Sequence, residues 1–68
     1  MSDFRTRLLV YMGAEKLTAR AFEARTGISK NTINGWMTGR GAPAYHNMRR
    51  LAETTGRSAS WWLGLEEL

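Results

Sequence analysis

The chain has 68 residues and carries a formal net charge of +4 at pH 7. This length gives one small domain, close to the lower limit at which a hydrophobic core alone holds a fold together. The lack of Cys excludes disulfides and thiolate metal sites, and one His and one Asp leave little material for catalysis. The composition therefore predicts a binding domain that is not an enzyme and that needs no cofactor or small-molecule substrate.

No apolar run is long enough for a signal peptide or a membrane span, so we expect a cytoplasmic protein without a membrane partner. Residues 16–57 include eight Lys or Arg residues and two Glu residues. This excess favours an anionic partner such as nucleic acid. A solvated basic surface is the plain alternative, because small domains commonly have one.

Turn signals divide the chain into five predicted helices. The first spans about residues 2–12, with Ser2 as its expected N-cap and Gly13 as the left-handed residue that ends it. The other four are expected at about residues 19–26, 30–38, 44–55 and 59–65, with N-caps at Thr18, Ser29 and Ser58 and terminating glycines at Gly27, Gly39 and Gly56.

The fold class that follows is all-α. No segment alternates apolar and polar residues with a period of two over a useful length, so we expect a single bundle of five helices across residues 1–68. One apolar face of the fourth predicted helix consists of Tyr45, Met48, Leu51, Ala52 and Thr55.

The second and third predicted helices are separated by only three residues, Gly27, Ile28 and Ser29. Gly27 tolerates a positive φ, Ile28 is expected to point inward, and Ser29 can bond free amides of the next helix. A Gly-containing turn of this length fits two helices that cross at about 90–120°, as in a helix-turn-helix. An ordinary corner between two helices is the alternative.

The third predicted helix has two contrasting faces. Its apolar side consists of Ile33, Trp36 and Met37, and broadly opposite lie Asn31, Asn34, Gly35 and Thr38, with Lys30 on one flank. Asn can bond the N6/N7 edge of adenine bidentately, and Lys suits guanine or a phosphate. A glycine lets the helix approach a groove closely, at a cost in helix stability. The combination predicts a DNA-reading face.

Groups suited to phosphates flank this helix. Helix N-termini attract anions, and Thr18, Ala19 and Arg20 open the second predicted helix. Thr38, Arg40 and Gly41 follow the third, where Arg40 lies between two glycines and is free to reach a phosphate. For Arg49 and Arg50, phosphate contact and simple solvation both stay open.

Two segments, "TARAFEARTGISKNTINGWMTGRGAP" and "NMRRLAETTGRSASWWLG", resemble the lambda-repressor-like (XRE/Cro/CI) family of helix-turn-helix DNA-binding domains. Within it, they are most similar to the N-terminal domains of phage CI-type repressors. The resemblance covers about residues 4–63. Its strongest points are the "GRGAP" loop, "RLAETTG", the late "SASWWL", and the residues Phe22, Gly27, Ile28, Ile33 and Trp36.

This resemblance implies a five-helix fold whose third helix enters the major groove, usually as a homodimer on a palindromic operator, in a bacterial cytoplasm at the nucleoid. The family's base-reading positions fall on Ser29, Lys30, Asn31 and Asn34, with Gly35 as a further contact, and its phosphate positions fall near Thr18, Ala19, Thr38 and Arg40. The sequence departs from the family pattern at Glu23, where a small residue is usual. Either Glu23 extends outward from a slightly opened helix pair, or Ala24 takes part of the role.

Two tryptophans lie side by side in the last predicted helix. Trp61 matches a core aromatic of the family. Trp62 or Leu65 is the better candidate for an exposed apolar contact, and we expect this last helix, with Trp62 and Leu65 at the interface, to form a weak homodimer.

The leading hypothesis is a sequence-specific transcriptional repressor of phage or prophage type that binds double-stranded operator DNA. The DNA-binding antitoxin of a toxin–antitoxin pair is a second, although little chain remains beyond the bundle for binding a toxin. A helix-turn-helix adaptor that binds proteins is a third, and it predicts an acidic or apolar third helix.

Overall fold

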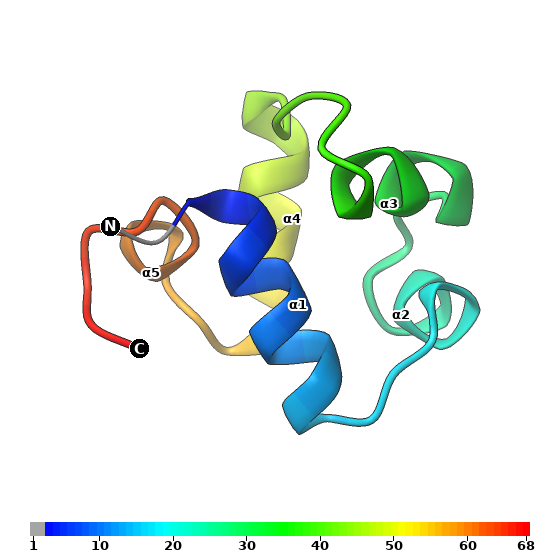
Figure 1. Ribbon diagram of the computed structural model, residues 1–68, viewed down its shortest axis with the longest axis horizontal. Helices are drawn as coiled ribbons and strands as arrows, with labels where there is room; N and C mark the ends of the chain where they lie inside the picture. The colour runs from blue at the N-terminus through cyan, green and yellow to red at the C-terminus, as the bar shows by residue number, and fades with distance from the viewer. Residues whose placement is uncertain (1–2) are drawn as a thin grey trace.

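The computed structural model describes residues 3–68, and five helices make up its regular structure (Figure 1). They are α1 (Phe4–Ala14), α2 (Ala19–Thr26), α3 (Lys30–Met37), α4 (Tyr45–Thr55) and α5 (Ala59–Trp62). No described residue lies in a strand, and the all-α five-helix bundle is confirmed. In Figure 1, α1 and α4 form the middle of the molecule, with α2 and α3 on one side and α5 on the other.

The predicted caps explain where the helices begin and end. Thr18, Ser29 and Ser58 each accept a hydrogen bond from a first-turn backbone N–H, at 3.1, 3.2 and 3.1 Å. Gly27 and Gly56 end α2 and α4 in the left-handed conformation, with φ of 79° and 77°. The observed limits of α2, α3 and α4 therefore agree with the prediction to within one residue.

Both ends of α1 differ from the prediction. The expected cap, Ser2, lies outside the described residues, and the N-cap is Asp3, whose carboxylate accepts a hydrogen bond from the Thr6 backbone N–H at 2.9 Å. That hydrogen bond holds the pKa of Asp3 below its usual value. Gly13 was wrongly expected to end the helix, because α1 continues through it to Ala14.

The left-handed residue after α1 is Lys16, with a φ of 55°. The N–H groups of Lys16 and Leu17 donate back to the carbonyls of Gly13 and Met12, at 3.2 and 2.8 Å, as in a Schellman motif. Leu17 packs against the core. The helix is therefore ended by an apolar contact after it and not by a glycine.

Helix α5 is three residues shorter than predicted. Gly64 adopts a φ of 83°, and its N–H donates to the Trp61 carbonyl at 3.1 Å. The N–H of Leu65 donates to the Ser60 carbonyl at 2.9 Å, which completes a second Schellman motif. A glycine that the sequence prediction placed inside the helix is therefore its stop.

An aromatic chain runs through the core. The Phe4 ring lies 5.2 Å from that of Trp36 and 5.7 Å from that of Trp62. Tyr11 continues the chain, 5.5 Å from Trp62 and 5.7 Å from Phe22. These rings join α1, α2, α3 and α5, since aromatic pairs at such distances add to the stability that burial provides.

The prediction that Trp62 is an exposed interface residue is wrong. Trp62 is fully buried, and its indole N–H donates to the Thr55 hydroxyl at 3.2 Å. The short α5 packs across α1 and α4, so it buries Trp62 as well as the neighbouring Trp61. Leu65 remains exposed, as predicted.

Tyr45 also departs from the prediction. It was placed on the apolar face of the fourth helix with Leu51, but it is 82% exposed while Leu51 is fully buried. The reason is its position in the first turn of α4, which extends past the N-terminal end of α1 (Figure 1).

None of the helices in residues 3–68 has the length and apolar character needed to cross a membrane.

Replacing Trp62 by Ala is expected to lower the free energy of unfolding by about 3–5 kcal/mol, because the change removes a buried indole from the core. Leu65→Ala is the control and should change that free energy by less than about 0.5 kcal/mol, because Leu65 is exposed. Urea denaturation followed by circular dichroism measures both. Equally small losses would show that Trp62 is not a core residue.

Candidate nucleic-acid interface

The turn between α2 and α3 is fixed at every residue. Gly27 has a φ of 79°, and Ile28 is buried at 3% exposure. The buried Thr26 hydroxyl donates to the Phe22 carbonyl at 2.8 Å and accepts from the Ile28 N–H at 3.1 Å. Because both the apolar and the polar groups are satisfied, the turn holds α3 at one angle to α2. Thr26 could not be identified from the sequence, because its role appears only with its two partners.

A side chain of α4, that of Arg50, lies next to the same turn. A Cβ atom at Gly27 would lie 2.7 Å from Nη1 of Arg50, but this atom is the tip of a flexible, exposed side chain that can move aside. Gly27 is therefore required by its positive φ and not by lack of space. Arg50, for which phosphate contact and solvation were both open, lies against the turn.

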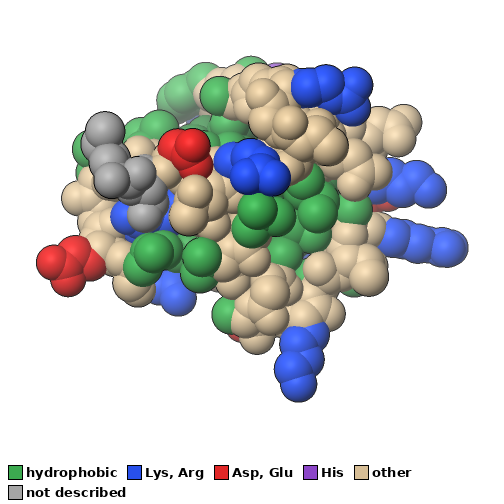
Figure 2. Space-filling model, in the orientation of Figure 1, with side chains coloured by type: hydrophobic (Ala, Val, Ile, Leu, Met, Phe, Trp, Pro, Cys, Tyr) green, Lys and Arg blue, Asp and Glu red, His purple; other side chains and the backbone are tan. Residues whose placement is uncertain are grey.

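Helix α3 packs one face into the core and leaves the other exposed. Ile33 and Trp36 are buried, at 0% and 4% exposure. The residues predicted to read bases stand on the outer side, where Ser29, Lys30, Asn31 and Asn34 are all exposed. Figure 2 shows Lys and Arg side chains projecting from the side of the molecule on which α2 and α3 lie.

Gly35 occupies a half-buried position in α3, beside this exposed face. A Cβ atom built there meets no other atom within 4 Å. Nothing in residues 3–68 therefore requires a glycine at this position, although a glycine within a helix costs about 0.5–1 kcal/mol relative to Ala.

The residues predicted to bind phosphates lie at the start of α2 and the end of α3. Thr18 uses its hydroxyl as the cap of α2, which leaves the first-turn amides of Ala19 and Arg20 without a side-chain acceptor among residues 3–68. At the other end, Arg40 Nε donates to the Thr38 hydroxyl at 3.2 Å. Gly41 follows with a φ of 118°.

Thr38 in turn ties this group to the helix. Its hydroxyl donates to the carbonyls of Asn34 and Gly35, both at 3.1 Å. The Thr38 hydroxyl therefore links the Arg40 guanidinium to the C-terminus of α3. The structure brings Thr38 and Arg40 together, and both residues are exposed, so an anion can reach them.

Glu23 and Ala24, the two residues considered for the close approach of α2 and α3, differ in their exposure. Glu23 is half-buried and Ala24 is exposed, so Ala24 does not take over the role of the missing small residue. The Glu23 backbone still accepts from the Gly27 N–H at 2.7 Å. The end of α2 is therefore regular.

Sequence reasoning also missed Arg5. Its Nε donates to the Met37 carbonyl at 2.6 Å, across 32 positions of the chain. No pattern in the sequence indicates this contact, because it exists only once α1 and α3 pack together.

The charges of this surface are not neutralised by the protein itself. The ion pairs of residues 3–68 are Arg25 with Glu15, at 2.9 Å, and Arg49 with Glu53, at 3.3 Å. Neither pair includes a residue of α3 or of the short segments on either side of it. The cationic side chains of Lys30 and Arg40 are thus left without a carboxylate partner among residues 3–68. The described residues also contain no group of His, Cys, Asp and Glu side chains arranged to hold a metal.

A family model described as "Helix-turn-helix" matches residues 11–62, more than half of the chain. The chain belongs to this family. The match is to the XRE, lambda-repressor-like type, and it contains α2, the turn, α3 and α4. No curated protein and no solved structure matches the chain. The helix-turn-helix domain described here is accordingly a DNA-binding domain of the regulatory kind.

Gly35→Ala is expected to raise the free energy of unfolding by about 0.5–1 kcal/mol and to weaken DNA binding, because a methyl group stiffens α3 but occupies the space beside its exposed face. Gly13→Ala is the matched control, since Gly13 is also helical and a Cβ there also meets nothing within 4 Å. It should stabilise the domain without changing its affinity for DNA. Urea denaturation and fluorescence anisotropy with a duplex selected from a random pool measure the two effects. Unchanged affinity in Gly35→Ala would contradict the close approach.

Proposed function

We propose that this helix-turn-helix domain is a sequence-specific transcriptional repressor that reads double-stranded DNA with α3 in the major groove. The observation that carries the proposal is the exposed polar face of α3, which lies opposite the buried Ile33 and Trp36. A rigid turn positions this face, and no acidic residue lies on α3. The alternative of a protein-binding adaptor predicts an acidic or apolar surface there, which α3 does not have.

Base recognition is assigned to the exposed face of α3 and to its N-cap. Asn31 and Asn34 are exposed amides that can bond an adenine edge bidentately, and Lys30 can bond guanine. Ser29 lies at the cap, where its hydroxyl already accepts one backbone N–H and retains a proton to donate. Gly35 allows the helix backbone to approach the groove.

Phosphate binding is assigned to the two flanks of the helix-turn-helix unit. These are Thr18, Ala19 and Arg20 at the start of α2, and Thr38, Arg40 and Gly41 after α3. Such contacts fix the position of the protein on the duplex and make its affinity depend on salt.

The repressor would act as a weak homodimer on a palindromic operator, with half-sites about one helical turn apart. Leu65, at 76% exposure, is the remaining candidate for the interface now that Trp62 is placed in the core, and Leu63, at 56%, lies two residues before it. Exposed apolar groups in one segment commonly mark an interface. Occlusion of a promoter of phage or prophage origin in a bacterial cytoplasm is the corresponding biological role.

Selection of binding sites from a random DNA pool at a stated salt concentration tests the function. A palindromic consensus is expected, and failure to enrich any sequence would contradict the proposal.

On the selected duplex, Asn31→Ala should cost about 1–3 kcal/mol of binding free energy and relax the preference at one base position. Arg40→Ala is the contrasting variant, which should weaken all sequences similarly and lower the salt dependence. If Asn31→Ala discriminates between DNA sequences as well as the unmodified protein does, the bases are read by another face of the domain.

Leu65→Lys is expected to shift the domain toward monomer, because it places a charge in the apolar interface. Sedimentation equilibrium at high protein concentration, with and without the selected duplex, measures the association. Leu9→Lys is the control, since Leu9 on α1 is also exposed, at 38%, and lies outside the proposed interface. Detection of monomer alone for the unmodified domain, even on DNA, would overturn the dimer.

A further inference from the structure

The C-terminus of α3 faces the region in which phosphates are expected. A helix ends with four carbonyl groups that have no partner within the helix. In α3 the first three are satisfied locally, because the backbone N–H groups of residues 38–40 donate to the carbonyls of Asn34, Gly35 and Trp36 at 2.8–3.1 Å. The fourth carbonyl, that of Met37, lies beyond the reach of this local pattern.

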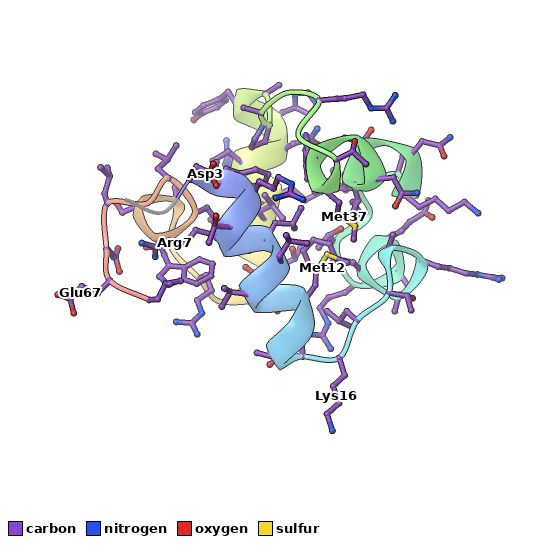
Figure 3. The ribbon with its side chains drawn as sticks, in the orientation of Figure 1. Asp3, Arg7, Met12, Lys16, Met37 and Glu67 are labelled. Carbon is purple, nitrogen blue, oxygen red and sulfur yellow. The ribbon has the colours of Figure 1, made fainter. Side chains whose placement is uncertain are left out.

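Arg5 satisfies the fourth carbonyl. Its Nε donates to Met37 O at 2.6 Å, and Figure 3 places Met37 at the end of α3 nearest α1. The last turn of α3 contains no Lys or Arg. Arg5, directly, and Arg40, through the Thr38 hydroxyl, supply the cations that a helix C-terminus favours. These charges offset the partial negative charge of the helix end, which would otherwise oppose a nearby phosphate.

The rest of the Arg5 guanidinium is available. The bond from Nε is the only hydrogen bond that this side chain makes within residues 3–68, and the side chain is exposed. Cδ of Arg5 lies 3.8 Å from where a Cβ atom at Gly39 would be. Arg5 is therefore beside the loop that contains Thr38 and Arg40, the pair to which phosphate binding is assigned.

We propose that Arg5 is a further DNA-phosphate ligand, with Nε holding the end of α3 while Nη1 and Nη2 donate to a phosphate next to the one bound by Arg40. The inference rests on the proposed function and adds α1 to the interface. A guanidinium presents five donors in a fixed fork, so it can serve a carbonyl and a phosphate at once, whereas a lysine ammonium on a flexible stem is poorly suited to both. Arg5 thus positions the recognition helix and contacts the ligand.

The test measures binding of the full chain to its selected duplex over a series of salt concentrations. Arg5→Gln should lower the slope of log K against log salt by about 0.9, the value for one phosphate contact on duplex DNA. The affinity should fall about five- to tenfold near 0.1 M salt, with an unchanged consensus. Lys16→Gln removes one charge from an exposed residue that follows the opposite end of α1, to which no DNA contact is assigned (Figure 3). It is the matched control and should leave the slope close to that of the unmodified protein.

A second measurement remains decisive if Arg5→Gln is poorly folded. Single phosphates of the duplex are replaced by neutral methylphosphonates, and binding of the unmodified protein is compared with that of Arg5→Lys. One position should weaken the unmodified protein by a larger factor than the variant. If every position affects the two proteins equally, or if Lys16→Gln lowers the slope as much as Arg5→Gln does, Arg5 is not a phosphate ligand. In those cases the unmodified protein still binds DNA, whereas failure of the proposed function would abolish that binding itself.

Discussion

The three-residue turn between α2 and α3 is the constraint on which the interface depends. Ile28 is buried there, and the Thr26 hydroxyl bonds the chain on both sides of the left-handed Gly27. With the angle of α3 fixed, Ile33 and Trp36 enter the core and the opposite side of the helix is exposed. A flexible turn would let α3 present several faces, and a short polar surface would then have no defined register on DNA.

The aromatic core connects α3 to the rest of the molecule. Trp36 of α3 contacts Phe4, and Phe4 contacts Trp62, so α3 and α5 are held through α1. Arg7 is buried beside α5, 5.1 Å from the Trp61 ring, which stabilises its charge through a cation–π contact (Figure 3). A small domain without disulfides depends on such large buried side chains.

Charge is distributed unequally over the structure. Arg25 and Arg49 are paired with carboxylates, whereas Lys30 and Arg40 on the α3 side have no carboxylate partner among the described residues. Unpaired cations on the exposed side of a helix-turn-helix attract the DNA backbone and release its counterions, which makes affinity sensitive to salt. Lys30 begins α3 and Arg40 follows its end, and the packing of α1 against α3 brings Arg5 to that same end.

The sequence by itself determined the helix-turn-helix, since Thr18, Gly27 and Ser29 act on neighbouring backbone groups and need no distant partner. It also indicated which side of α3 is buried, because apolar periodicity within one helix reports burial directly. Only the tertiary structure decided that Trp62 is buried while Leu65 is exposed, since adjacent apolar residues in a short helix differ only in what packs against them. It alone decided the bond from Arg5 to Met37, because a contact across 32 positions leaves no local pattern in the chain.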